Sequence, residues 1–343
     1  MELIINGETK EVPSNITIEK LLEREEVEMP QYVSVQLNDS FVEREHFADT
    51  ELKPRDRVDF LYYMGGGSEE DLSPEEVERY SRQLILKEVG LKGQLKLRQS
   101  SVLVVGAGGL GSPAAFYLTA AGVGKIGLID YDKVELHNLQ RQILYTAQDV
   151  GRYKVEAASE KLKELNSDVE IVTYRDKLSA DNALDILKDY QFVIDATDGF
   201  DSKFLINDAC YFAGKPFIHA GILRFEGQTI TVIPGETTCY RCIFPTPPPP
   251  GAVPSCAQAG ILGVLGGIIG TIEAAEAIKY FLGEGDLLLN RLLYFNAKEM
   301  HYHKVNTSRN PNCPLCGENP SITELNEENI VCQSAEGETG ENS

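Results

Sequence analysis

The stretch SVLVVGAGGLGSPAAFYLTAAG at residues 101–122 constrains the fold of this 343-residue chain more than any other segment. An apolar run typical of a buried strand leads into a glycine-rich loop, and the loop leads into a run typical of a helix. Its glycines fit the pattern G-x-G-x-x-G and are Gly106, Gly108, Gly109 and Gly111. Such glycines let backbone N–H groups approach a phosphate, and the helix N-terminus adds positive potential. The segment therefore predicts a nucleotide site, with a tight turn that binds nothing as the alternative.

Strands and helices continue to alternate after this loop. The apolar runs at 125–130, 169–174, 191–198 and 216–221 predict strands, and the periodic runs between them predict helices. This rhythm is typical of a Rossmann-like, doubly wound α/β sheet whose strands are mostly parallel. The run RFEGQTITVIP (224–234) instead indicates an antiparallel hairpin, so we expect a mixed sheet, followed by a long helix.

Residues 1–67 predict a separate small domain. Two strands, a helix with Thr17 as a possible N-cap, and further strands follow one another, which is the order of a β-grasp, ubiquitin-like fold. This domain ends at the three glycines 65–67, and a helix begins near Ser73, with Pro74 and Glu76 completing a capping signature. We therefore expect three parts: the β-grasp domain 1–67, the nucleotide-binding domain 68–325, and an acidic, disordered tail 326–343.

Charge and hydropathy exclude some classes of protein. The formal net charge of −21 argues against nucleic acid as a partner, because phosphates attract clusters of Lys and Arg. Apolar runs stay below the ~18 to 20 residues that a membrane span requires. No basic-then-apolar signal peptide opens the chain, so we expect a cytoplasmic protein.

Polar residues after the glycine loop distinguish between nucleotides. Asp130 ends the next strand, where an acid can bond ribose hydroxyls, and on this alone NAD is the first candidate. Arg141 and Lys154 follow, and two cations suit a triphosphate better than a nicotinamide, although surface cations are often only solvated. Asp198 follows a sheet strand and can hold Mg²⁺ or cap the next helix. Together these residues favour ATP.

Four of the seven cysteines form two C-x-x-C pairs, Cys239/Cys242 and Cys313/Cys316. Two such pairs predict a tetrahedral, structural Zn²⁺ site, with a pair of redox dithiols as the alternative. Cys256 follows a proline-rich loop and precedes a helix, whose N-terminus can favour the thiolate; an inert core residue is the alternative. Cys210 reads as core.

The order of these motifs resembles that of a known family. RYSRQ, GAGGLGS, NLQRQ, DATD, CYRC, PPPPGAVPSCAQAG and CPLCG resemble the ThiF/MoeB/HesA family of ubiquitin-activating-like adenylyltransferases over roughly residues 72 to 325. The first 67 residues resemble ThiS, a ubiquitin-like sulfur carrier. The proline-rich loop and the second cysteine pair look more like the molybdopterin branch of the family.

The resemblance implies roles for residues that match the family's motifs. It implies that the catalytic residues are Arg82, Arg141, Lys154, Asp198 and Cys256, with Arg82 supplied by the partner subunit of a homodimer. It implies that the nucleotide contacts Gly106, Gly108, Gly109, Gly111, Asp130, His137, Asn138, Leu139, Gln140, Arg141, Lys154, Asp198 and Gly199. The family commonly has Asn where this chain has Gly199, which removes any side-chain contact there. The implied cofactors are ATP, Mg²⁺ and, on the four paired cysteines, Zn²⁺.

The implied reaction is adenylation of the C-terminal glycine of a ubiquitin-like sulfur carrier, in thiamine or molybdopterin biosynthesis; cysteine synthesis and tRNA thiolation are compatible with the same active site. A sulfur donor such as a cysteine desulfurase or a rhodanese would then act. The alternatives are an NAD-dependent oxidoreductase and a non-enzymatic scaffold that binds a ubiquitin-like protein. Because Gly66 and Gly67 both lie in peptide bonds, the fused carrier is either cut there or retained while the enzyme serves separate carriers.

Overall fold

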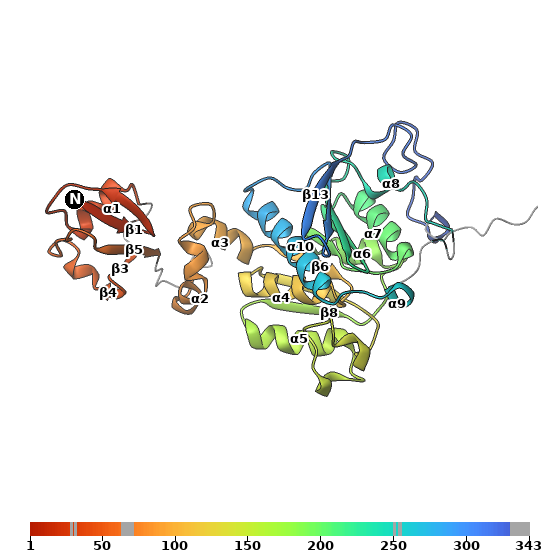
Figure 1. Cartoon of the computed structure of the whole chain (residues 1–343), viewed down its shortest axis with the longest axis horizontal. Coiled ribbons are helices and arrows are strands. Elements are labelled where there is room, and N and C mark those ends of the chain that lie inside the picture. The colour runs from red at the N-terminus through yellow and green to blue at the C-terminus, as the bar shows by residue number, and fades with distance from the viewer. Residues whose placement is uncertain (28–29, 31–32, 63–71, 250–251, 253–255, 330–343) are drawn as a thin grey trace, which may run out of the picture. The chain divides into compact units, whose positions relative to one another are not determined.

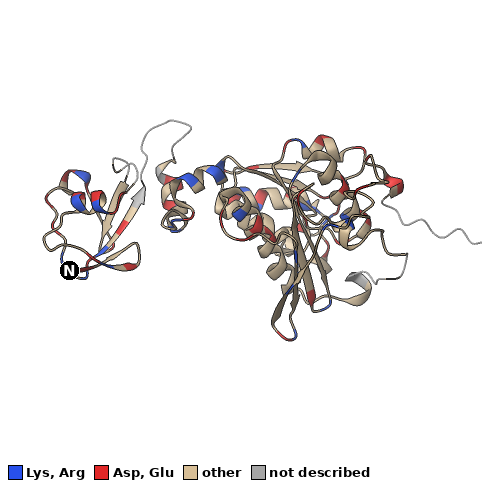
Figure 2. Cartoon of the chain, turned by 90° about the horizontal axis from the view of Figure 1, so that it is seen from above, with Lys and Arg blue, Asp and Glu red and all other residues tan. Residues whose placement is uncertain are grey.

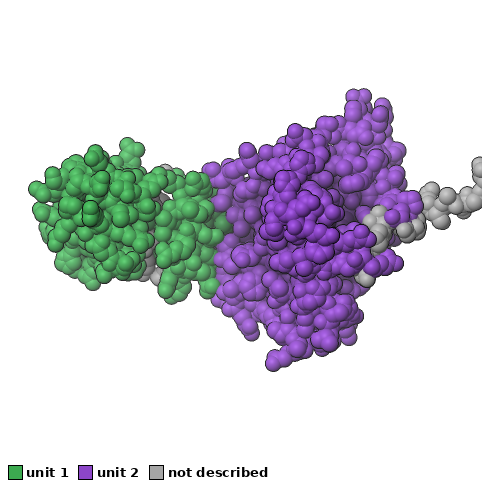
Figure 3. Space-filling view, viewed as in Figure 1, with its two compact units in different colours: residues 1–97 green, residues 98–343 purple. Residues whose placement is uncertain are grey.

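The computed structural model describes residues 1–27, 30, 33–62, 72–249, 252 and 256–329. They fall into two compact units, Met1–Leu97 and Arg98–Ser343 (Figure 3). The three glycines at 65–67 and the tail from residue 330 lie outside the described residues, so the hypothesis of a cut after Gly66 or Gly67 stays a prediction.

A five-stranded sheet with the strand order β2-β1-β5-β3-β4 forms the N-terminal part of the first unit. Its elements are β1 (Glu2–Ile5), β2 (Glu8–Glu11), α1 (Ile18–Arg24), β3 (Val33–Leu37), β4 (Ser40–Val42), the 3₁₀ turn η2 (Arg44–His46) and β5 (Arg57–Tyr62). The first strand pairs in parallel with the last, and the other pairs are antiparallel. Thr17 accepts the Lys20 N–H and starts α1, whose Leu21 and Leu22 are buried with the strand residues. The predicted β-grasp order is confirmed.

Two helices, α2 (Pro74–Leu84) and α3 (Gly90–Arg98), complete the first unit. The capping box is formed as predicted: the Glu76 N–H donates to Ser73 Oγ, and the Ser73 N–H donates to the Glu76 carboxylate. Apolar side chains from both helices, including Tyr80, Leu84 and Leu91, form a small core of their own. The boundary between the compact units falls before Arg98, the last residue of α3, and the functional boundary after residue 67 stays a prediction.

An eight-stranded mixed sheet in the order β13-β12-β11-β10-β9-β6-β7-β8 organises the second unit (Figure 1). The strands are β6 (Ser101–Val105), β7 (Lys125–Ile129), β8 (Glu170–Tyr174), β9 (Phe192–Asp195), β10 (Phe217–Leu223), β11 (Glu226–Val232), β12 (Arg291–Asn296) and β13 (His301–Asn306). Strands β8, β7, β6, β9 and β10 are parallel, and β11 to β13 are antiparallel. The mixed, doubly wound sheet is therefore confirmed.

Helices cover both faces of this sheet. The helices are α4 (Gly111–Ala121), α5 (Lys154–Leu165), α6 (Ala183–Leu187), α7 (Phe200–Ala213), α8 (Tyr240–Ile243), α9 (Cys256–Ala259) and α10 (Val264–Leu282). One layer contains α4, α5 and α10, and the other contains α6 and α7 (Figure 1). The strand order reverses between β6 and β9, and ligands bind in such sheets outside the carboxyl ends of the strands at this point.

Charged residues of both signs are interspersed along the described elements (Figure 2). Among the described residues, no helix combines the length and the apolar character needed to cross a membrane.

Candidate nucleotide site and cysteine cluster

The glycine loop lies at the point where the strand order reverses. Gly106 has φ +95°, a left-handed conformation that favours glycine. A Cβ on Gly106 would lie 2.8 Å from the Ala196 carbonyl oxygen after β9, and one on Gly111 would lie 1.9 Å from the Gly106 carbonyl oxygen. The loop therefore depends on glycine for its shape, and it leads directly into α4.

Two side chains fix the backbone of this loop by hydrogen bonds to Ala107. The Asp130 carboxylate accepts the Ala107 N–H at 2.9 Å and the Asp132 N–H at 2.8 Å. The Tyr145 hydroxyl donates to the Ala107 carbonyl at 2.7 Å. Burial raises the pKa of Asp130, while Lys154 and the two backbone donors oppose that rise. Asp130, which was predicted to bind the ribose, therefore holds the loop backbone in place. The contact from Tyr145 was not predicted from the sequence.

The predicted cations lie beside the same loop. The Arg141 stem contacts Gly109, since a Cβ there would lie 3.4 Å from Arg141 Cγ, and its guanidinium donates to the His137 carbonyl at 3.1 Å. Lys154 is 6% exposed, and its Nζ lies 2.7 Å from an Asp132 oxygen and 3.8 Å from an Asp130 oxygen. Two cationic side chains therefore lie beside the glycine loop, and Lys154 is paired there with the carboxylates of Asp132 and Asp130.

The segment between the two cations forms a short turn. The 3₁₀ turn η3 (Leu136–Asn138) is capped by Glu135, whose N–H donates to Asn138 Oδ1 at 3.0 Å. Asn138 is buried, whereas His137 and Gln140 are exposed and Leu139 is half-buried. The structure thus brings Arg141, at the end of this segment, next to the loop, and the roles of residues 137–141 stay predictions.

Asp198 lies just after β9, the strand that neighbours β6 where the strand order reverses. It is exposed, and the N-cap of α7 is its neighbour Gly199, where no side-chain cap bond forms. The alternative reading of Asp198 as the helix cap is therefore wrong. The pKa of Tyr131, just after β7, is raised mainly by Asp132 and burial, and Asp198 adds to this rise. Its carboxylate is free to meet a cation.

The start of α10 packs against the loop through a line of glycines that the sequence interpretation missed. A Cβ on Gly263 would lie 2.3 Å from the Gln140 carbonyl oxygen, one on Gly266 2.5 Å from the Gly109 carbonyl oxygen, and one on Gly270 2.3 Å from the Leu110 carbonyl oxygen. The spacing of three and four residues places these glycines on one helix face. Glycines at this spacing in the sequence of a helix indicate that another backbone packs closely against it, so this contact could have been predicted.

Substitution of Gly266 tests this contact. We expect Gly266→Ala to displace the glycine loop and to lower stability by about 1–3 kcal/mol, as overpacking does, and to weaken ATP binding. Gly267→Ala is the matched control, since nothing lies within 4 Å of its Cβ position. There, a helical alanine should raise stability by up to about 1 kcal/mol. Denaturant unfolding and ATP titration check both variants; equal behaviour would contradict the contact.

The four paired cysteines converge on one point. Sγ–Sγ distances within the cluster include 3.7 Å for Cys239–Cys242, 3.4 Å for Cys239–Cys316 and 3.3 Å for Cys242–Cys316. Tetrahedral Zn²⁺ with bonds of about 2.3 Å separates its sulfurs by about 3.8 Å, so the set fits the ion closely. The Cys239 thiol donates to Cys242, and hydrogen bonds within the cluster, first of all those with Cys239, lower the pKa of Cys242 and Cys313. The arrangement supports a closed metal site.

Arg241, inside the first cysteine pair, anchors the cluster. It is fully buried and donates from Nε and Nη2 to the two oxygens of Asp208 on α7, each at 2.7 Å. Its Nη1 also donates to the Pro245 carbonyl at 3.1 Å, and Nη2 to the Asn329 carbonyl at 2.9 Å. One buried side chain thus connects the cysteine pair, α7, the start of the proline-rich loop and the end of the described chain.

The remaining predicted site residues are Arg82, Cys256 and Gly199. Arg82 is an exposed residue of α2 in the first unit. Cys256 begins α9, and its side chain lies outside what the structure describes. Gly199 has room around it, since a Cβ would meet only Ser202 Oγ at 3.8 Å. Cys210, in contrast, is fully buried, and burial raises the pKa of its thiol, as expected of a core residue.

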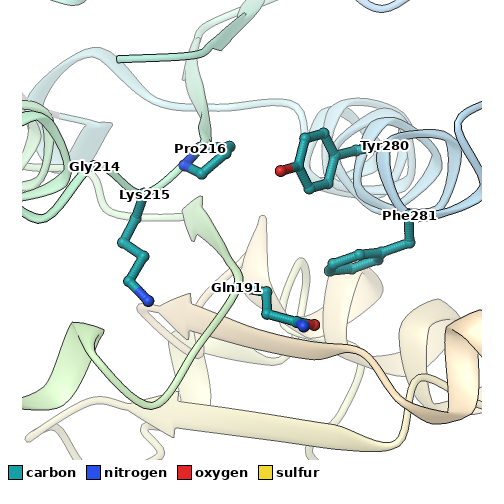
Figure 4. Close-up of a pocket in the computed structure, with 6 residues that line it drawn as sticks. All are labelled: Gln191, Gly214, Lys215, Pro216, Tyr280 and Phe281. Atoms are coloured by element: carbon teal, nitrogen blue, oxygen red, sulfur yellow. The ribbon is translucent and has the colours of Figure 1, made fainter. Parts of the chain in front are cut away.

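A surface hollow lies at the amino-terminal ends of β9 and β10, opposite the strand ends that the glycine loop follows. Gln191 and Pro216 stand before β9 and β10, and Tyr280 and Phe281 come from the end of α10 (Figure 4). Because nucleotides bind at the carboxyl ends of the strands, this hollow is not the candidate site.

The glycine loop at the reversal of strand order, the flanking cations and the four-cysteine cluster are the features of a nucleotide-binding α/β protein with a cysteine cluster suited to a metal ion. The chain belongs to the ThiF family, whose model matches residues 80–315. Residues 3–67 match the model of the ThiS family. Both parts of the resemblance seen in the sequence are confirmed.

Similar proteins agree with this assignment. The sulfur carrier protein adenylyltransferase of Thermus thermophilus is 48% identical over 263 residues, covering 75% of this chain and 97% of that protein. The adenylyltransferase and sulfurtransferase MOCS3 of Aedes aegypti is 48% identical over 255 residues, and this match covers 74% of the chain but only 58% of MOCS3. The crystal structure of E. coli MccB with ATP is 25% identical, with a TM-score of 0.61 over 69% of this chain and 74% of that one.

Proposed function

We propose that the chain adenylates the C-terminal glycine of a ubiquitin-like sulfur carrier with ATP. The main support is the 48% identity to a sulfur carrier protein adenylyltransferase along 97% of that protein. The glycine loop at the sheet's switch point and the cations beside it supply what a triphosphate needs.

The proposed reaction joins the carrier to AMP. A carboxylate oxygen of the terminal glycine attacks the α-phosphorus of ATP, the bond to the β-phosphate oxygen breaks, and pyrophosphate leaves. An acyl-adenylate results. The loop N–H groups, Arg141 and Lys154 stabilise charge that develops on the phosphates, and Arg82 adds a further cation from a partner subunit of a homodimer. Residues 137–140 contact the nucleotide, and Asp130 meets the ribose.

Two metal ions belong to the proposal. Asp198 would hold Mg²⁺, which when bound neutralises phosphate charge; its exposed carboxylate, free of any cap bond, suits this task. The four cysteines would hold Zn²⁺ in a closed, structural site, since their sulfur spacing suits the ion and leaves no open position.

The domain roles follow from this reading. Residues 1–67 would be a carrier-type domain, 68–325 the adenylating domain, and 326–343 an acidic tail. The enzyme would activate either the carrier released after Gly66 or Gly67 or a separate one. A cysteine desulfurase or a rhodanese would then donate sulfur, in thiamine or molybdopterin cofactor biosynthesis. Intact-mass analysis of the chain from its native host distinguishes a cut chain from a retained fusion.

Pyrophosphate exchange tests the activity directly. Full-length protein, Mg·ATP, labelled pyrophosphate and a free carrier ending in Gly-Gly should give label in ATP that depends on the carrier. The same carrier lacking its last two glycines is the control. Absence of exchange with a carrier that a related adenylyltransferase activates would contradict the proposal.

Replacement of Cys256 separates adenylation from sulfur transfer. We expect Cys256→Ala to keep pyrophosphate exchange within about twofold of the wild-type rate, because adenylation is charge stabilisation and needs no nucleophile from the protein. Thiocarboxylate formation with a sulfur donor, followed by mass spectrometry of the carrier, should fall more than about tenfold. Unchanged thiocarboxylate yield would remove Cys256 from the mechanism.

A further inference from the structure

We propose that Asp195, Lys203 and His219 form a buried positioning network that fixes the turn after β9 and thereby places the Asp198 carboxylate. The inference rests on the proposed metal role of Asp198. These three residues play no part in the roles implied by the family resemblance, and they come from β9, α7 and β10.

The network begins at the end of β9. Asp195 is fully buried, and its Oδ1 accepts the Thr197 N–H at 3.1 Å and the Thr197 hydroxyl at 2.6 Å. Its Oδ2 lies 2.7 Å from His219 Nδ1, which must be the donor because a carboxylate only accepts. Burial opposes the charge, but Lys203, His219 and Thr197 outweigh it and lower the pKa of Asp195 to about 2. Asp195 is therefore a fixed anion.

Lys203 closes the network from α7. It is 6% exposed, and its Nζ donates to the Thr197 carbonyl at 2.8 Å and the Ala220 carbonyl at 2.5 Å, with Asp195 Oδ2 at 3.5 Å. The N–H, hydroxyl and carbonyl of Thr197 are thus all bound. The residue that follows Thr197 is Asp198, so the network determines where the backbone presents that carboxylate.

The turn is also confined from the other side. The Ala196 carbonyl lies so close to Gly106 that a Cβ there would be 2.8 Å away. Among the described residues no hydrogen bond holds the Asp198 side chain, so its position depends on the backbone below it. Buried ion pairs contribute little to stability compared with apolar packing, which fits a role in positioning better than one in stability alone.

Two variants test the network in the full-length chain. Thr197→Val keeps the side-chain shape but removes the hydroxyl donor, and Lys203→Met removes the ammonium. We expect the exchange rate to fall about 10-fold for Thr197→Val and about 100-fold for Lys203→Met, as small misplacements do. The half-saturating Mg²⁺ concentration should rise in both. Thr197→Val should melt within about 4 °C of the wild type.

Lys215→Ala is the matched control. This lysine also donates to a backbone carbonyl, that of Lys188 at 3.2 Å. It lines the hollow at the amino-terminal ends of β9 and β10 (Figure 4), away from the strand ends that Asp198 follows. Its exchange rate and Mg²⁺ dependence should equal those of the wild type.

Thermal unfolding separates the proposed network from the proposed adenylation activity. The rise in melting temperature that ATP produces is recorded against Mg²⁺ concentration for each protein. If the wild type shows this rise but no exchange, the proposed function fails, and the Mg²⁺ dependence of the rise still judges the network. Wild-type Mg²⁺ dependence in Thr197→Val would overturn the network even if Lys203→Met fails to fold. No Mg²⁺-dependent effect of ATP on the wild type would overturn the network, whereas the exchange assay alone decides the proposed function.

Discussion

Asp198→Ala should abolish carrier-dependent pyrophosphate exchange, with a loss on the order of 10³-fold, because the Mg²⁺ that this carboxylate is proposed to hold would stabilise the charge that develops on the phosphates by several kcal/mol. The side chain is exposed and caps no helix, so its removal should leave the fold intact. Exchange assays across Mg²⁺ concentrations measure the loss, and the melting temperature without nucleotide confirms folding.

Two further variants sharpen this test. Asp198→Asn keeps the shape and removes the charge, so it should resemble the alanine variant if the charge matters. Asp201→Ala, on the first turn of the same helix α7, is the matched control, since this exposed acid lies three residues further on. We expect its exchange rate to stay near that of the wild type. Equal losses at Asp198 and Asp201 would indicate a general effect of acidity.

Much of the fold could be predicted because local signals and tertiary structure agree. Ser73, Pro74 and Glu76 form the capping box that their spacing indicates. The run at 101–106 forms a central strand, and Gly106 takes the conformation that only glycine adopts readily. The hairpin β12–β13 was missed, because every residue of β13 is exposed and the sequence there lacks alternation.

The residues of the candidate site could be predicted from the sequence, but the hydrogen bonds between them could not. Asp130 was identified beside the loop, yet its bond to the Ala107 N–H depends on how β6 and β7 align. Lys203 and His219 carry no local motif, and only the parallel pairing of β9 with β10 brings His219 beside Asp195. Such contacts join residues distant in sequence, so periodicity and spacing do not show them.

Loss of the proposed zinc ion should have the largest effect on stability. Cys313→Ser is expected to abolish zinc binding, because three thiolates do not complete the tetrahedral site. Cys239, Cys313 and Cys316 are buried within the same apolar core as Phe204 and Tyr240, so unpaired thiols would remain inside that core. A loss of about 4 kcal/mol, typical when a structural metal is removed, corresponds to a fall of about 10 °C in melting temperature.

The effect should reach beyond the cluster through Arg241. This side chain joins the first cysteine pair to Asp208 and to the Asn329 carbonyl, so metal loss should release the chain end and expose residues near 329 to protease. Elemental analysis should give one zinc per wild-type chain and per Cys256→Ala chain, and none in Cys313→Ser. Two disulfides without zinc in the purified wild type would support the redox reading instead. A Cys313→Ser protein that melts like the wild type would show that the fold does not depend on this metal.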